Sequence, residues 1–156
     1  MHPHRLTAWA IFTAVAVGFA APTFAGELPG AQTLASPHEF AALVAKLEAA
    51  VTEHKMAVVA KASASQGAAA RGVKIPGNAV IMVFRNDYAV RMLEASVPAG
   101  IEAPLRFYVT ENADGKASLT WRAPSAIFAP YGSAPLDKMA HELDPIFAAI
   151  ARDAVR

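Results

Sequence analysis

The chain has 156 residues, of which 54% are hydrophobic, and a formal net charge of +1. This length fits one domain, and the hydrophobic share is large enough for a core, which excludes a disordered chain. The near-neutral charge and the scattered basic residues exclude a general nucleic-acid or anionic-membrane binder. The chain has no cysteine, which excludes disulfides and thiol chemistry, so the core alone must stabilise the fold.

The N-terminus has the pattern of a secretory signal peptide. Arg5 lies in a weakly basic start, residues 6–21 are mostly apolar, and a small-residue cleavage site ends at Ala25. A membrane anchor is the alternative, but an apolar run of 16 residues is short for a transmembrane helix. We therefore expect cleavage after Ala25 and a periplasmic or secreted mature chain with no stable membrane association. In that mature chain, 13 basic residues balance 13 acidic ones.

The first predicted elements are a short strand and a long helix. Residues 32–35 fit a short strand. Ser36, Pro37 and Glu39 then match an N-cap, a first helical position and a capping box. Apolar residues follow at helical spacing, which predicts a helix over residues 37–55 with one apolar face.

The next stretch predicts two strands separated by a short helix and a turn. Residues 56–62 fit a strand, and the Ala-rich residues 63–72 fit a short helix. Pro76 and Gly77 stand in the order that a type II turn requires. Residues 79–84 are apolar at every position, which is typical of a strand covered on both faces or one whose second face meets a partner.

Two further helices are predicted beyond this strand. Asn86 is placed to cap a helix that runs to about Ala95, with Asp87 in its first turn. Near the C-terminus, apolar residues repeat at helical spacing on both sides of Pro145. Proline inside a helix removes a backbone hydrogen bond, so we expect a kink, or two abutting helices with Asp144 as the cap of the second.

Residues 105–111 and 116–122 predict a β-hairpin whose register follows from its side chains. A two-residue loop would mix apolar and polar side chains on each face, whereas a three-residue loop ending at Gly115 separates them. This register requires a left-handed backbone at Gly115. It pairs Val109 with Leu119, Phe107 with Trp121, Tyr108 with Thr120, and Arg106 with Arg122.

The predicted order of elements is β-α-β-(α)-β-α-β-β-α. This order indicates an α+β fold with a single antiparallel sheet and the helices packed on one face. We expect residues 1–25 to be the signal peptide, residues 26–35 to be a linker with a short first strand, and residues 36–156 to form a single α+β domain.

The stretch from Gly72 to Ser125 is similar to a known protein family. It has the turn and core residues of the family pattern at Phe84, Asn86, Pro98, Ile101, Pro104, Leu105, Gly115 and Pro124. Arg85 and Asp87 stand where the family often has Gly and usually has Pro, and Gly100 is offset by one position. The chain thus resembles, over residues 36–155, the bacterial and archaeal family called domain of unknown function 302. The resemblance implies a TATA-binding-protein-like fold, often dimeric, and implies no agreed activity or cofactor.

The sequence contains no recognisable catalytic set, and we predict no cofactor. His141 and Glu142 begin like a zinc-protease helix motif, but Pro145 occupies the place of the second histidine. The methionines that follow the signal peptide have no local clustering, which favours core filling over copper binding. A small enzyme with a site assembled only in three dimensions, or a metal- or haem-binding protein that uses His141 and Met139, remains an alternative.

The main candidate for a contact site is a group of arginines with a tyrosine. Arg106, Arg122 and Tyr108 share one face of the predicted hairpin, and Arg85 ends a neighbouring strand. Planar guanidinium groups suit a carboxylate or phosphate, so these residues are candidates for an anion or partner contact. The alternative is a solvated face, or ion pairs with glutamates such as Glu102.

A sheet with helices on one face leaves its other face open. Because residues 79–84 are apolar throughout, part of an apolar strand would face solvent in a monomer. We therefore expect a homodimer or a protein partner on the open sheet face, with acidic groups that neutralise Arg106 and Arg122. The favoured function is that of an exported, non-catalytic binding or accessory protein.

Overall fold

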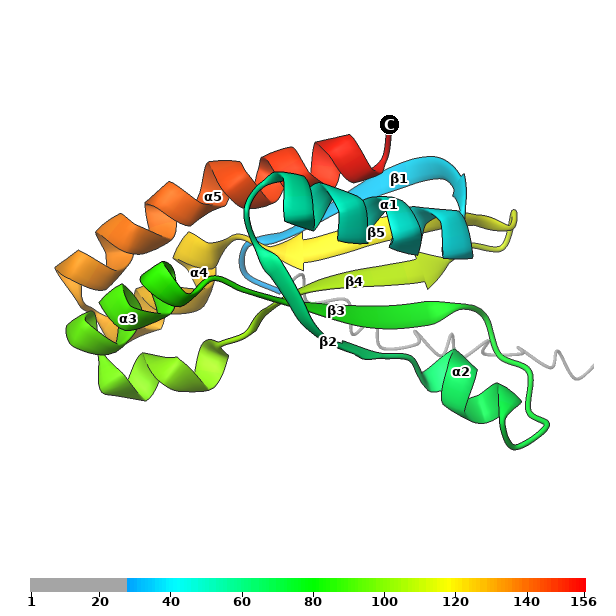
Figure 1. The fold of residues 1–156 in the computed structure, drawn as a ribbon, viewed down its shortest axis with the longest axis horizontal. Helices are drawn as coiled ribbons and strands as arrows, with labels where there is room; N and C mark the ends of the chain where they lie inside the picture. The colour runs from blue at the N-terminus through cyan, green and yellow to red at the C-terminus, as the bar shows by residue number, and fades with distance from the viewer. Residues whose placement is uncertain (1–27) are drawn as a thin grey trace, which may run out of the picture.

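The structure is a computed structural model that describes residues 28–156, so the expected signal peptide lies outside the described residues. Its centre is a five-stranded sheet in the order β1-β5-β4-β3-β2 (Figure 1), and every neighbouring pair is antiparallel. The strands are β1 (Ala31–Glu39), β2 (Ala57–Ala62), β3 (Asn78–Phe84), β4 (Leu105–Glu111) and β5 (Lys116–Arg122). The helices are α1 (Phe40–Glu53), α2 (Ala64–Ala69), α3 (Asn86–Ala95), α4 (Pro124–Phe128) and α5 (Ala134–Ala154), with short 3-10 helices η1 (Val97–Glu102) and η2 (Ala129–Tyr131).

The two long helices, α1 and α5, lie over the same face of the sheet (Figure 1). Ile81, Phe107 and Leu119 are fully buried on that face of the three central strands. The ring of Phe147 from α5 stacks on that of Phe107, with a centroid distance of 5.0 Å. The predicted α+β fold, with one antiparallel sheet and its helices on one face, is therefore confirmed.

The hairpin register predicted from the side chains is also confirmed. Val109 pairs with Leu119, Phe107 with Trp121 and Tyr108 with Thr120. Gly115 has a φ of +79°, the left-handed conformation that the three-residue loop requires. The loop is closed by Asn112, whose backbone N–H donates to the carbonyl of Lys116 at 2.7 Å.

The predicted first strand exists, but its predicted end and the predicted start of the first helix were wrong. Strand β1 continues through the expected capping box to Glu39, and α1 begins only at Phe40. Ser36 pairs with Ala117 of β5, and its hydroxyl oxygen accepts a hydrogen bond from the backbone N–H of His38. A long ladder with β5, bulged between Ser36 and Glu39, thus outcompetes the local helix signal.

Two further local predictions, one of a turn and one of a helix cap, were also wrong. Gly77 is not left-handed, so Pro76 and Gly77 do not form a type II turn. The glycine is needed for space, because an added Cβ would lie 2.6 Å from the Phe40 ring. Helix α3 includes Asn86 as its first residue, and Arg85 is the N-cap without a side-chain capping bond. Asn86 is therefore not the cap that the sequence indicates.

The C-terminal helix α5 runs continuously through Pro145 (Figure 1), so the expectation of two abutting helices was wrong. Asp144 does not cap a second helix. Its carboxylate instead accepts a hydrogen bond at 3.0 Å from the backbone N–H of Ser125, in the first turn of α4. Asp144 thus ties α4 to α5, because it satisfies a helix N–H that has no partner within α4.

Candidate functional site

The face of the sheet opposite the helices forms a surface that we call the open face. Cross-strand partners project to the same side, so the register identifies its members. A 2.9 Å contact between the hydroxyl oxygens of Thr33 and Thr120 agrees with this assignment. The open face consists of Ala31, Thr33, Ala35 and Glu39 of β1, Lys116, Ser118, Thr120 and Arg122 of β5, Arg106, Tyr108 and Thr110 of β4, Asn78, Val80, Met82 and Phe84 of β3, and Ala57, Ala60 and Ala62 of β2.

One end of the open face carries positive charge without matching negative charge. Arg106 and Arg122 lie one position beyond the last β4–β5 pair, Phe107 with Trp121, so they are neighbours at one end of the face. The Arg122 Nε donates to the carbonyl of Pro29 at 3.1 Å. Within residues 28–156 neither arginine makes an ion pair, and the carboxylate that the register places on the open face, that of Glu39, lies opposite Lys116 at the other end of β5.

The glutamate that could have paired with these arginines has another partner. The carboxylate of Glu102 accepts a hydrogen bond from the Tyr131 hydroxyl at 3.0 Å. Tyr108, whose ring is 42% exposed, lies beside the arginine pair on β4. The structure therefore brings together three of the four residues named from the sequence: Arg106, Arg122 and Tyr108.

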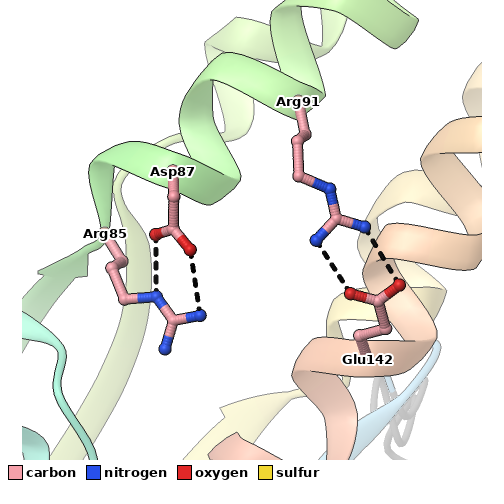
Figure 2. A network of polar contacts seen from close by, with 4 residues as sticks. All are labelled: Arg85, Asp87, Arg91 and Glu142. Atoms are coloured by element: carbon pink, nitrogen blue, oxygen red, sulfur yellow. Dashed lines mark hydrogen bonds and ion pairs between the residues drawn. The ribbon is translucent and has the colours of Figure 1, made fainter.

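Arg85, the fourth residue, belongs to a separate network at the start of α3 (Figure 2). Its guanidinium donates two hydrogen bonds to Asp87, at 2.8 and 3.1 Å, and lies 4.2 Å from the centroid of the Tyr88 ring. One helical turn after Asp87, Arg91 makes a second two-bonded pair, with Glu142 of α5 (Figure 2). The hydrogen bonds from Arg85 and Arg91 lower the pKa of the Asp87 and Glu142 carboxyls, respectively, below their usual values.

A small pocket lies between α3, α5 and the covered face of the sheet. Its volume is about 30 Å³, and Arg85 is the one charged residue among those that line it. Three methionines that are far apart in the sequence, Met56, Met92 and Met139, line this pocket together. Sequence spacing gave no sign of this convergence, because each methionine comes from a different element.

A larger groove lies between α1 and the segment that connects β2 with β3. Its volume is about 540 Å³, and its wall combines apolar residues such as Phe40 and Ile75 with polar ones. Lys61 and Glu48 form an ion pair of 2.8 Å beside it. Glu111, which lines the opposite part of the groove, accepts a hydrogen bond from the backbone N–H of Gly77. Each of these polar groups therefore already has an ion-pair or hydrogen-bond partner in the protein.

The histidines lie apart from one another and from the pocket. The Nε2 of His54 contacts the Asp153 carboxylate at 2.8 Å, which lowers the pKa of Asp153. The His141 side chain is 71% exposed and lies 3.4 Å from Asp144, whereas Met139 is buried on the other side of α5. Thus His141 and Met139 are not brought together. In residues 28–156, no group of three or more His, Asp or Glu side chains is placed to hold a metal ion.

Comparison with known proteins shows to which family this chain belongs. The family described as "Domain of unknown function DUF302" matches residues 32–152. The chain belongs to this family. The resemblance read from the turn and core residues of the sequence is therefore confirmed. Among curated proteins, none matches the chain.

A solved structure of the same family has the same fold. It is the crystal structure of an uncharacterized conserved DUF302 protein from Bacillus stearothermophilus, with a TM-score of 0.73 and 16% sequence identity. The match covers 81% of this chain and 98% of that protein. In the described part of this DUF302 chain, no helix combines the length and apolar character needed to cross a membrane.

Proposed function

We propose that this DUF302 protein is an exported, non-catalytic binding protein whose open face engages an acidic protein partner. The observation that carries the proposal is the arginine pair. Arg106 and Arg122 are adjacent at one end of the open face, and neither makes an ion pair within the described residues. A partner that supplies carboxylates would form charge-assisted, two-bonded contacts with the guanidinium groups.

The rest of the open face supports a protein partner over a small anion. Beside the arginines, Val80, Met82 and Phe84 of β3 are half-buried, and Tyr108 is exposed. Interfaces between proteins are enriched in tyrosine, methionine and arginine, with charged groups towards the rim. The open face has this composition, with its two arginines at one end, so an acidic partner could contact the arginines and cover the apolar strand at once.

The probe for this proposal is a short, labelled peptide rich in Asp and Glu, with its Asn and Gln counterpart as the neutral control. We expect the mature protein to bind the acidic peptide, with affinity that falls as salt rises. Arg106→Glu and Arg122→Glu should each weaken binding by about ten-fold or more, because like charges across an interface repel. Fluorescence anisotropy measures both effects.

A matched control is available in Arg71, which is also exposed and lies after α2, away from the open face. Arg71→Glu changes the net charge by the same amount and should leave the affinity nearly unchanged. Equal binding of the neutral peptide, or an equal loss in Arg71→Glu, would show that the arginine pair on the open face is not the site.

A further inference from the structure

We infer that Met56, Met92 and Met139 form a binding site for a soft monovalent metal ion, Cu(I) or its analogue Ag(I). These residues come from the turn before β2, from α3 and from α5, and the fold brings all three to one pocket. Of the residues that line the pocket, Phe84 also belongs to the open face, but the site does not depend on the function proposed for that face.

The burial of the methionines distinguishes this pocket from an ordinary surface feature. Met56, Met92 and Met139 are 7%, 4% and 2% exposed, respectively. Closely packed cores leave few voids as large as a water molecule. Here the methionines are among the residues that line a space of about 30 Å³, enough for a single atom-sized guest. Methionine side chains are unbranched and flexible, so their sulfur atoms can adjust toward such a guest.

The chemistry of the lining selects the kind of ion. The other residues that line the pocket are mainly apolar, including the aromatic residues Phe84, Tyr88 and Phe128. A hydrated divalent ion would lose its water there without gaining oxygen ligands. Thioethers are soft ligands that favour Cu(I) over such hard ions. We therefore expect Ag(I) or Cu(I) to bind, and Mg²⁺ to be excluded.

The charge at the pocket does not oppose a cation. Arg85 is the charged residue in the lining, and Asp87 neutralises it through two hydrogen bonds. The Arg85 guanidinium also lies against the Tyr88 ring, at 4.2 Å from its centroid, which fixes its position at the pocket. The ion would enter and leave as a monovalent cation, so binding requires no electron transfer.

Titration of the untagged mature protein with Ag(I) tests this site, with native mass spectrometry and the NMR signals of the methionine methyl groups as readouts. We expect one Ag(I) ion to bind and the methyl signals of Met56, Met92 and Met139 to shift. Anaerobic competition with a Cu(I) chelator should then give a measurable affinity for Cu(I). The double variant Met92→Leu/Met139→Leu should lower these affinities by about ten-fold or more.

The chain provides its own control in Met82. This residue lies on the open face, outside the pocket lining, so Met82→Leu should bind Ag(I) as the wild type does. Leucine and methionine have similar volumes, so these variants should remain folded, which a thermal melt verifies. The inference is overturned if the wild type binds no Ag(I), or if the double variant binds as tightly as the wild type, which would place the ion at histidines.

Discussion

The left-handed backbone at Gly115 sets the register of the β4–β5 hairpin, and that register places Arg106 beside Arg122. An added Cβ at Gly115 would meet no atom within 4 Å, so the cost of a side chain there is conformational and not steric. We therefore expect Gly115→Ala to lower the free energy of unfolding by about 1–2 kcal/mol, because an L-residue disfavours this conformation. Chemical denaturation of the mature protein measures the change.

Gly67 supplies the comparison for this prediction. It also has open space around its Cβ position, but it lies within α2 and is not left-handed. Gly67→Ala should stabilise the protein by up to about 1 kcal/mol, because alanine favours the helix. If the two substitutions had the same sign, backbone conformation would not be what Gly115 contributes.

The candidate sites differ in how far single residues reveal them. Alternation along two strands was enough to place Arg106 and Tyr108 on one face, because strand periodicity is local. The pocket between α3 and α5 was not predictable in this way. Met56, Met92 and Met139 meet only through the packing of three elements, and no local pattern reports such packing.

At the scale of elements, local sequence signals predicted the wrong structure where a tertiary contact provided more stabilisation. Residues 36–39 carry a good helix start, yet they form β1, because pairing with β5 satisfies their backbone across the sheet. Helix α5 also tolerates Pro145, where the sequence indicates a break. In contrast, the apolar faces of α1 and α5 and the register of the hairpin were predicted correctly, since each follows from the periodicity of side chains that are buried in the core.

The contact between α3 and α5 should make stability depend on pH. The hydrogen bonds from Arg91 lower the pKa of Glu142 in the folded protein. A lowered carboxyl pKa stabilises the fold above the unfolded value of about 4.3, and this contribution is lost as pH falls through the folded value. Glu142→Gln should therefore reduce the free energy of unfolding at neutral pH, and the difference from the wild type should vanish in acid.

Unfolding curves recorded between neutral and acidic pH measure this difference. Glu94→Gln serves as the control, because Glu94 lies on α3, the helix that carries Arg91, and makes no ion pair within the described residues. High salt should also diminish the effect of Glu142→Gln, since the pair is partly exposed. A difference that persisted unchanged into acid would mean that the Arg91–Glu142 charges do not support the α3–α5 contact.

For the whole molecule, the export prediction concerns the residues that precede the fold. A short apolar run followed by a small-residue site should be cleaved after Ala25. The protein recovered from the periplasm or medium should then begin at Gly26, which N-terminal sequencing and intact mass determine. Exported protein that retained the apolar run of residues 6–21 would instead indicate a membrane anchor.

Association of the whole molecule through the open face depends on its charge, and the homodimer expected from the sequence stays a prediction. Two open faces that pack with their arginine ends together would bring the arginine pairs of both copies close to each other, and the Glu39 carboxylate of the described face lies at the other end of β5. Repulsion of this kind is screened by salt. We therefore expect self-association through this face to be weak at low ionic strength and to strengthen as salt rises, whereas binding of an acidic partner should weaken.

Sedimentation of the mature protein across a range of salt concentrations separates these two behaviours. Arg106→Glu places an opposite charge beside Arg122, so it should strengthen self-association at low salt while it weakens binding of the acidic peptide. Arg71→Glu should change neither. A dimer that is equally stable at all salt concentrations and insensitive to Arg106→Glu would have to use another surface, and the open face would then remain free for the acidic partner.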